Sequence, residues 1–318
     1  MIYLVTGAAG FLGRHLVRAL LAQGKAVRAF DLCAPQDGEP EVEWQVGDVR
    51  DAEAVQKACE GVEVVYHLAA LIPQRRADAA TMQAVNVGGT QHVLNAALAR
   101  GVRRVVYLSS VEIFGVPAIV PCPEDGPLAP LGEYGRNKIA AEKACHQAVE
   151  LGLEVTILRP PTIIGPGLAE PFLVGMLNDI RAGRPVMLLG RGQNRFQFVH
   201  VEDVVAACLI VADHPAAVGQ AFHVGAADVP SIRSMVEEVI HRVGSASKVR
   251  SIPVPLARLA MAFLRPLGKA PLEPEHLVIA IADYLFDIRK ARQVLGWEPR
   301  WGNIEAVMDT YRADFQSS

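Results

Sequence analysis

Short apolar runs alternate along the first half of the chain with longer segments in which apolar residues recur every three or four positions. The runs are rich in β-branched residues and bounded by turn formers, which is typical of strands, whereas the longer segments have the period of amphipathic helices. This alternation predicts an α/β fold built on a doubly wound parallel sheet with right-handed crossovers. The predicted strands are 2–6, 26–31, 42–46, 63–68, 104–110 and 154–160, and the predicted helices are 11–24, 51–60, 80–100 and 134–151.

The regular pattern ends after Pro160, where the stretch PPTIIGPGLAEP is dense in Pro and Gly and is predicted to be a loop. A helix around 171–183, a short strand PVMLLG and a return to the sheet near 220–225 follow it. The remainder has a mostly helical pattern. The predicted organisation is a sheet domain over 1–160 with 196–228 returning to it, and a smaller, mostly helical lobe over 161–195 and 229–318.

Length and charge narrow the possible partners. The 318 residues exceed the size at which one core keeps growing, which favours a large domain with an attached lobe. The 31 basic and 34 acidic residues give a net charge of -3 without a block of like charges, so neither a nucleic-acid surface nor an anionic membrane partner is expected. The apolar runs 204–212 and 254–267 are too short or too interrupted by arginine to span a bilayer. A small-molecule ligand is therefore the expected partner.

The cysteines and the first residues indicate a compartment. The number of cysteines is odd and no pair has C-x-x-C spacing, which favours reduced thiols in a cytoplasmic protein and makes a zinc site unexpected. The start, MIYLVTGAAG, has no charged leader before its apolar run, so we expect a strand here and no signal peptide. The cysteines are Cys33, Cys59, Cys122, Cys145 and Cys208.

The stretch TGAAGFLG places Gly7, Gly10 and Gly13 between the first predicted strand and the first predicted helix. Small residues there let backbone N–H groups approach a pyrophosphate, which also gains from the positive end of the helix dipole. Asp31 ends the second strand, where a carboxylate can accept hydrogen bonds from ribose hydroxyls. It repels a 2′-phosphate, and the following LCAPQDGE supplies no Arg or Lys, so NAD is favoured over NADP. These features predict a Rossmann-type dinucleotide site.

Tyr134 and Lys138 stand four residues apart in a predicted helix and therefore share one face. Hydride transfer between NAD and a secondary alcohol or ketone requires a proton to leave or join the oxygen, and an ammonium one turn away is expected to lower the pKa of the phenol. Ser110, after the fifth strand, can hydrogen-bond the substrate oxygen. The spacing alone is typical of a surface pair, but with Ser110 and the glycine motif it predicts a proton-transfer device.

Motifs along nearly the whole chain resemble the extended short-chain dehydrogenase/reductase superfamily, specifically its NAD-dependent epimerase/dehydratase and 3β-hydroxysteroid dehydrogenase branches. The resemblance implies that Ser110, Tyr134 and Lys138 are catalytic, and that helices 80–100 and 134–151 form the four-helix interface of a homodimer. The motifs are TGAAGFLG (6–13), GDVRD (47–51), HLAAL (67–71), NVGGT (86–90), VVYLSSVEIFG (105–115), YGRNK (134–138), LRPPTIIGPG (158–167), FVHVEDV (198–204) and FDIRKARQVLGWEP (286–299).

The resemblance also implies which residues contact the cofactor. Asp48 and Val49 are expected beside the adenine, Asn86 behind the site, and the segment from Pro160 to Ile163 beside the nicotinamide. Ser109 is expected to be a cofactor-side or structural hydroxyl. The full set of expected NAD contacts is Gly7, Gly10, Phe11, Leu12, Gly13, Asp31, Asp48, Val49, Leu68, Ala69, Ala70, Asn86, Ser109, Tyr134, Lys138, Pro161 and Ile163.

Three functions are compatible with the predicted NAD site and the Ser110, Tyr134 and Lys138 set. The first is epimerisation of a nucleotide sugar, in which NAD oxidises the sugar transiently and returns the hydride. The second resembles 3β-hydroxysteroid dehydrogenase and converts a hydrophobic alcohol or ketone, with NAD as a true substrate. The third is an NAD(H)-binding redox-sensing regulator, a class that typically loses the Tyr or the Lys. Retention of Tyr134 and Lys138 makes the regulator the weakest of the three, and the first is our leading hypothesis.

Residues that would select the substrate depart from the epimerase and dehydratase patterns. Glu112 occupies the position of an acid that assists proton removal in dehydratases, but Val111 replaces the aspartate that precedes it there. Thr162 stands where epimerases usually have Asn, and in NRFQFVHV the arginine is displaced by one. Glu112 is thus a candidate catalytic acid, and Thr162, Asn194 and Arg195 are candidate substrate contacts.

Overall fold

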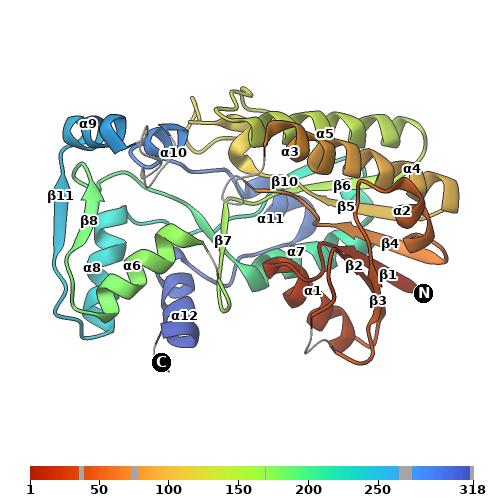
Figure 1. Ribbon diagram of the computed structural model, residues 1–318, viewed down its shortest axis with the longest axis horizontal. Coiled ribbons are helices and arrows are strands. Elements are labelled where there is room, and N and C mark those ends of the chain that lie inside the picture. The colour runs from red at the N-terminus through yellow and green to blue at the C-terminus, as the bar shows by residue number, and fades with distance from the viewer. Residues whose placement is uncertain (36–38, 73–77, 169, 265–273, 316–318) are drawn as a thin grey trace.

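The computed structural model describes residues 1–35, 39–72, 78–168, 170–264 and 274–315. At its centre is a parallel sheet of seven strands in the order β10-β6-β5-β4-β1-β2-β3 (Figure 1). From β1 the chain adds β2 and β3 on one side, and then β4, β5, β6 and β10 on the other side. The topological switch point therefore lies between β1 and β4. The predicted α/β fold is confirmed. The strands are β1 (Ile2–Thr6), β2 (Ala26–Asp31), β3 (Glu43–Val46), β4 (Val62–His67), β5 (Arg104–Leu108), β6 (Glu154–Arg159) and β10 (Ala221–His223).

Helices cover both faces of the sheet (Figure 1). Alternate residues of a strand point to opposite faces, so Val5 of β1 packs with α1 (Phe11–Ala22) and α7 (Val201–Asp213). Its neighbour Leu4 packs on the other face. The helices of that second face are α2 (Ala52–Ala58), α4 (Thr90–Arg100) and α5 (Glu133–Glu150).

Two segments differ from the expectation. The predicted helix 80–100 is α3 (Ala79–Gln83) followed by α4, with a π-helical turn over Ala84–Gly89 between them. The segment predicted to be a loop after Pro160 contains a strand, β7 (Thr162–Ile164), which pairs in parallel with β9 (Phe198–His200). Three β-branched residues in succession favour extended backbone despite the surrounding Pro and Gly, so the loop prediction was wrong at this point.

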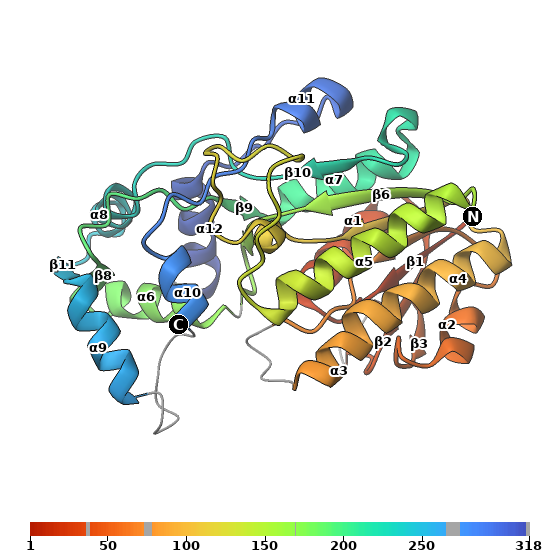
Figure 2. The ribbon, with the colours of Figure 1, turned by 90° about the horizontal axis from the view of Figure 1, so that it is seen from above.

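The smaller lobe lies at one end of the molecule (Figure 2), beyond β7 (Figure 1). Its core joins β8 and β11, which pair with each other, to α6, α8 and α12. α11 (Arg289–Leu295) returns toward the sheet, where Lys290 donates to the carbonyl of Ala221 in β10. Within the described residues, no helix is long and apolar enough to cross a membrane. The lobe consists of α6 (Pro171–Arg181), β8 (Val186–Leu189), α8 (Ile232–Arg242), β11 (Val249–Ile252), α9 (Val254–Leu264), α10 (Pro274–Ile279) and α12 (Asn303–Phe315).

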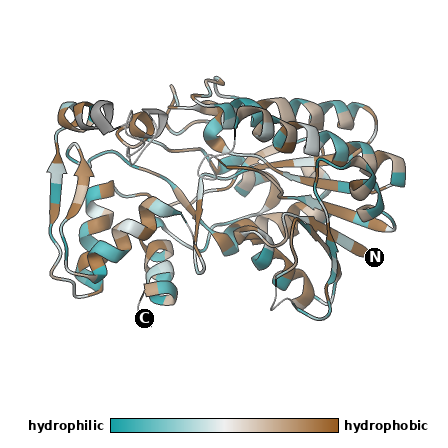
Figure 3. Cartoon of the chain, in the orientation of Figure 1, coloured by the Kyte–Doolittle hydropathy of each residue, from teal (hydrophilic) through white to brown (hydrophobic). Residues whose placement is uncertain are grey.

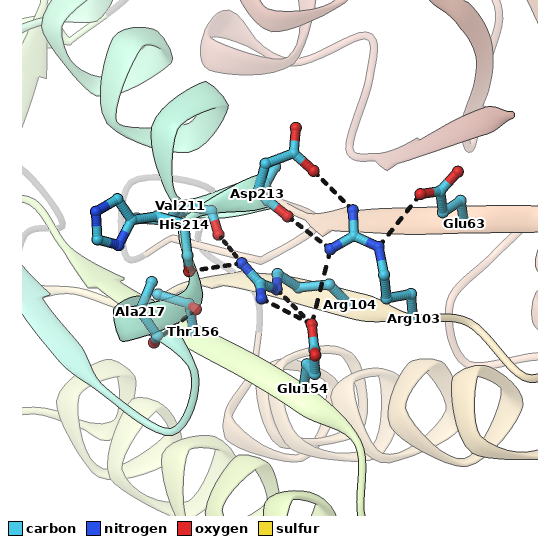
Figure 4. Close-up of polar contacts among 10 residues, drawn as sticks. Glu63, Arg103, Arg104, Glu154, Thr156, Val211, Asp213, His214 and Ala217 are labelled. Atoms are coloured by element: carbon cyan, nitrogen blue, oxygen red, sulfur yellow. Dashed lines mark hydrogen bonds and ion pairs between the residues drawn. The ribbon is translucent and has the colours of Figure 1, made fainter. Parts of the chain in front are cut away.

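Two adjacent arginines fasten α7 to the amino-terminal edge of the sheet (Figure 4). The buried Arg104 donates to Glu154 at 2.7 Å and to the carbonyls of Val211 and His214 at 2.7 and 2.9 Å. Arg103 donates to Asp213 at 2.7 Å. These contacts lie at the edge opposite the carboxyl ends of the strands. They therefore stabilise the scaffold without occupying the carboxyl edge.

A buried ion pair joins β6 to α5. Arg159 donates two hydrogen bonds to Glu142, at 2.9 and 2.7 Å, and both side chains are less than a tenth exposed. Such a pair contributes little over an apolar replacement, but removal of one partner leaves a buried charge uncompensated.

We therefore expect Glu142→Gln to lower the free energy of unfolding by about 3 to 5 kcal/mol, measured by chemical denaturation. Glu133→Gln is the matched control, because its pair with Arg136 is half exposed and should be worth less than about 1 kcal/mol. Equal losses in the two variants would contradict the expectation.

Candidate active site

The turn after β1 packs directly on the segment that follows β4. Gly7 has a φ of +71°, and a Cβ there would lie 2.7 Å from the amide nitrogen of Ala69. A Cβ on Gly13 would lie 2.2 Å from the carbonyl oxygen of Gly7. Only glycine fits these positions, so the turn leaves open the groove that a pyrophosphate requires.

The amino terminus of α1 opens into this groove. Its N-cap, Gly10, supplies no side-chain hydrogen bond to the first turn, so the N–H groups that begin at Phe11 and Leu12 stay available to an anion. Asp31, at the end of β2, accepts from the backbone N–H of Ala9 at 2.9 Å and from that of Leu32 at 2.7 Å. The carboxylate expected to hold the ribose is thus fixed against the glycine turn.

A buried chain of hydrogen bonds ties β1 to β4 and α4. The Thr90 hydroxyl donates to the carbonyl of Asn86 at 2.7 Å, so it accepts from Nε2 of His67 at 3.0 Å. Nδ1 of His67 then accepts from the Thr6 hydroxyl at 2.7 Å. Burial, with a smaller effect of Lys138, lowers the pKa of His67 to about 3. The imidazole is therefore neutral, with one donor and one acceptor, as this series of hydrogen bonds requires.

Hydrogen bonds to Thr6 and Asn86 position the residues that follow β4. Thr6 accepts from the N–H of Ala69 at 3.3 Å. The amide side chain of Asn86, 1% exposed, accepts from the N–H of Leu71 and donates to its carbonyl, at 2.8 and 2.9 Å. Leu68 and Ala69 therefore lie against Gly7, and the cofactor contacts expected of Leu68, Ala69 and Ala70 stay predictions. The sequence motif indicated Asn86 but no role for His67.

Other expected cofactor residues lie around the same edge of the sheet. Both carboxylate oxygens of Asp48 accept from Arg50, which lowers the pKa of Asp48. Val49 is buried against Gly89. Pro161 and Ile163 flank the start of β7. The cofactor contacts of these residues stay predictions.

Ser110, Tyr134 and Lys138 come together at the carboxyl end of β5. Ser110 is the N-cap of a 3₁₀ turn, Val111–Phe114, and accepts from the N–H of Glu112 at 3.1 Å. Tyr134 and Lys138 lie in the first turns of α5. The Lys138 ammonium donates to the carbonyl of Leu108 at 2.6 Å and lies 5.6 Å from the centroid of the Tyr134 ring.

The pKa shifts differ from the expected direction for Tyr134. Burial, and next the charge of Glu112, raise the pKa of the phenol above its ordinary value, while a hydrogen bond from Ser110 lowers it. Burial also lowers the pKa of Lys138 to about 8, against the opposing effects of Glu142, Cys145 and Glu112. The surroundings of Tyr134 thus favour the neutral phenol, because loss of hydration and the charge of Glu112 outweigh the hydrogen bond from Ser110.

A second tyrosine, which was not among the predicted site residues, lies beside this site. Tyr284 is 2% exposed and packs with Val111 and Ile113 of the 3₁₀ turn, and its hydroxyl has no hydrogen-bond partner among the described residues. Burial, then Glu112 and Tyr134, raise its pKa. No motif marks Tyr284, because the contact joins segments far apart in the sequence.

The candidate substrate residues lie elsewhere in the lobe. Asn194 donates from its amide to the carbonyls of Ala280 and Ala282 at 3.0 and 2.9 Å. Arg195 is exposed and pairs with Asp283 at 3.3 Å. Thr162 begins β7. No hydrogen bond or ion pair links these side chains to the catalytic residues within the described chain. Nor do the described residues contain a cluster of three metal-ligating side chains.

The parallel sheet, glycine turn and buried Ser–Tyr–Lys set define a dinucleotide-binding protein of the short-chain dehydrogenase/reductase type. A short-chain dehydrogenase/reductase superfamily protein from Agrobacterium tumefaciens with bound NAD has a similar structure, with a TM-score of 0.79 and 27% identity over 100% of this chain and 98% of that one. MoeE5 in complex with UDP-glucose and NAD is similar to the same degree, with a TM-score of 0.79 and 26% identity over 100% and 99% of the two chains.

The family model of the NAD dependent epimerase/dehydratase family matches residues 3–225, and the chain belongs to this family of extended short-chain dehydrogenase/reductase enzymes. UDP-glucose 4-epimerase of Mycolicibacterium smegmatis is 32% identical over 96% of each chain. The 3 beta-hydroxysteroid dehydrogenase/Delta 5-->4-isomerase of Mycobacterium tuberculosis is 30% identical over 96% of this chain and 88% of the relative. The two relatives act on different substrates at almost equal similarity.

We expect Gly13→Ala to weaken NAD binding by at least about tenfold, because its Cβ would push the turn into the groove. Calorimetric titration with NAD measures the loss. Gly175→Ala is the control, since a Cβ there meets no atom within 4 Å. If Gly13→Ala fails to fold, Gly10→Ala, whose Cβ meets only the Gly7 carbonyl at 3.1 Å, replaces it. Unchanged affinity in a folded variant would contradict the role of the turn.

Proposed function

We propose that this protein is an NAD-dependent oxidoreductase that converts a secondary alcohol or ketone on a largely apolar small molecule, with Tyr134 as the acid/base. The observation that supports this substrate class is the apolar wall of side chains packed behind the catalytic 3₁₀ turn. Phe286 and Tyr284 are buried against Val111, Ile113 and Phe114, with Phe196 and Ile279 packed beside them. An apolar substrate matches such a wall better than a sugar diphosphate does.

NAD fits the residues of the groove. The glycine turn packs against neighbouring backbone so closely that a Cβ has no room, as in a pyrophosphate-binding turn, and the Asp31 carboxylate, fixed to Ala9 at 2.9 Å, suits two ribose hydroxyls and disfavours a 2′-phosphate. The Ser109 hydroxyl is buried without a partner among the described residues, as a cofactor-side donor would be. When bound, NAD accepts or returns the hydride at the substrate carbon.

Side chains of the protein itself transfer the proton. Ser110 hydrogen-bonds the substrate oxygen and, through its bond to Tyr134, directs that oxygen toward the phenol. Tyr134 gives the proton when a ketone is reduced and takes it when an alcohol is oxidised. Lys138, held by Leu108, supplies the positive charge that opposes the cost of forming a buried phenolate. In this proposal Glu112 assists proton removal at a neighbouring substrate position.

Epimerisation of a nucleotide sugar is the second candidate. The supporting observation is the full-length similarity to a UDP-glucose 4-epimerase. Against it, Asn194 is held by two carbonyls and Arg195 by Asp283, so neither is available to a diphosphate without breaking these contacts. A regulator without catalysis has less support, because Ser110, Tyr134 and Lys138 are brought together.

The assembly and the compartment follow from weaker observations. α4 and α5 lie side by side on one face of the sheet, which suits the four-helix interface of a homodimer. All five cysteines are free thiols, four of them buried, as expected in the reducing cytoplasm.

We expect Tyr134→Phe to lower kcat by at least about a hundredfold, the usual contribution of a general acid or base, while NAD affinity changes little. In the wild type, alcohol oxidation should increase with pH from neutrality, because it requires the ionised form of a phenol whose pKa burial raises. Ketone reduction uses the neutral phenol and should stay level. Loss of charge on Lys138 near pH 8 should flatten the rise in oxidation. A pH-independent oxidation rate would contradict this assignment.

The substrate class is tested with two probes. Dehydroepiandrosterone, a 3β-hydroxysteroid, should yield NADH in stoichiometric amount, detected by its absorbance. UDP-galactose should yield neither NADH nor UDP-glucose, detected by chromatography. Formation of UDP-glucose without net NADH would overturn the apolar-substrate proposal and establish the epimerase. A Tyr134→Phe sample run in parallel shows whether either activity belongs to this site.

A further inference from the structure

Helix α9 presents an apolar surface at the outer end of the smaller lobe. Ala257 is buried against the lobe at 8% exposure, but Leu256 and Leu259 are 56% and 55% exposed. These two leucines are three residues apart and therefore share one face of the helix. Figure 3 shows hydrophobic residues along α9, and Figure 2 places it away from the sheet domain. Two largely exposed leucines on one turn indicate that something covers this face.

The charge around α9 has one sign. Between Glu238 and Glu273 the sequence contains no Asp or Glu, in a chain whose net charge is -3. Arg250 is the second residue of β11, the strand that precedes the helix, and Arg258 lies within the helix. Both are exposed, and neither forms an ion pair with a described residue. The basic residues of this stretch are Arg242, Lys248, Arg250, Arg258, Arg265 and Lys269. The net charge of the whole chain does not reveal this local excess of basic residues.

We propose that α9 is a peripheral membrane-binding surface, with Leu256 and Leu259 inserted among the acyl chains of an anionic bilayer and Arg250 and Arg258 at its phosphate groups. An apolar face bordered by basic residues is the combination that interfacial helices use. The helix has 11 residues, which suits lying in the interface and is too short to span the bilayer.

A second copy of the chain matches the surface less well. A two-fold interface brings the same patch of each protomer together, so Arg250 and Arg258 of both protomers would be gathered at one interface with no acid nearby in the sequence. Like charges placed opposite one another across an interface are unfavourable. An anionic lipid surface supplies the missing negative charge and covers the leucines as well.

The inference goes beyond the proposed reaction and is tested without substrate. The purified full chain is mixed with sedimentable vesicles of phosphatidylcholine alone, or of phosphatidylcholine with phosphatidylglycerol, and the bound fraction is measured. We expect binding that needs phosphatidylglycerol and weakens with added salt. The double variant L256E/L259E should bind at least about tenfold more weakly, and R250Q/R258Q should lose most of the dependence on phosphatidylglycerol.

The matched control is L128E/L151E, which adds two acids at leucines that are 51% and 72% exposed elsewhere on the chain. It should bind as the wild type does. Thermal melting shows that each variant is folded. The proposal is overturned if the wild type does not bind anionic vesicles, or if L256E/L259E and L128E/L151E bind equally. It is also overturned if L256E/L259E converts a dimer to a monomer, by sedimentation, while lipid binding is unchanged.

Discussion

The close approach of the turn after β1 to the segment after β4 is the constraint on which the site depends. Gly7 lies so near Ala69 that a side chain at Gly7 has no room, and the Thr6–His67–Thr90 chain of hydrogen bonds holds the two strands in this relation. The groove at the switch point, the amino terminus of α1 and the position of Asp31 all follow from it. A neutral, fully bonded His67 makes the arrangement rigid, since an uncharged imidazole can satisfy both hydroxyls.

Burial sets the chemistry of the proton-transfer residues. Both Tyr134 and Lys138 lie almost out of solvent, and desolvation moves the pKa of each toward its neutral form. The Ser110 hydrogen bond favours the phenolate in Tyr134, whereas Glu112 opposes it. The reactive groups are thus balanced by their surroundings, which include the apolar cluster that Tyr284 and Phe286 form with the 3₁₀ turn. An acid/base of this kind depends on the lobe as much as on the helix that carries it.

Much of the fold could be predicted from local pattern. β1 and β2 begin and end where the apolar runs do, because a strand buried on both faces must be apolar throughout. β7 was missed because Pro and Gly surround its three β-branched residues, and its pairing with β9, more than thirty residues later, is not visible in the local pattern. The same reason explains Asn194: its type suggested a substrate contact, but its amide is bonded to carbonyls of residues 280 and 282.

The sequence by itself determined the parallel sheet, the glycine turn, the acidic end of β2 and the Tyr134–Lys138 face of α5, because these depend on residues that are close along the chain. Tertiary structure decided the rest. It brought Tyr284 beside Glu112 and Tyr134, reversed the expected pKa shift of Tyr134, and left Leu256 and Leu259 exposed on α9. Burial and hydration depend on which distant segments pack together, and neither spacing nor composition specifies that packing.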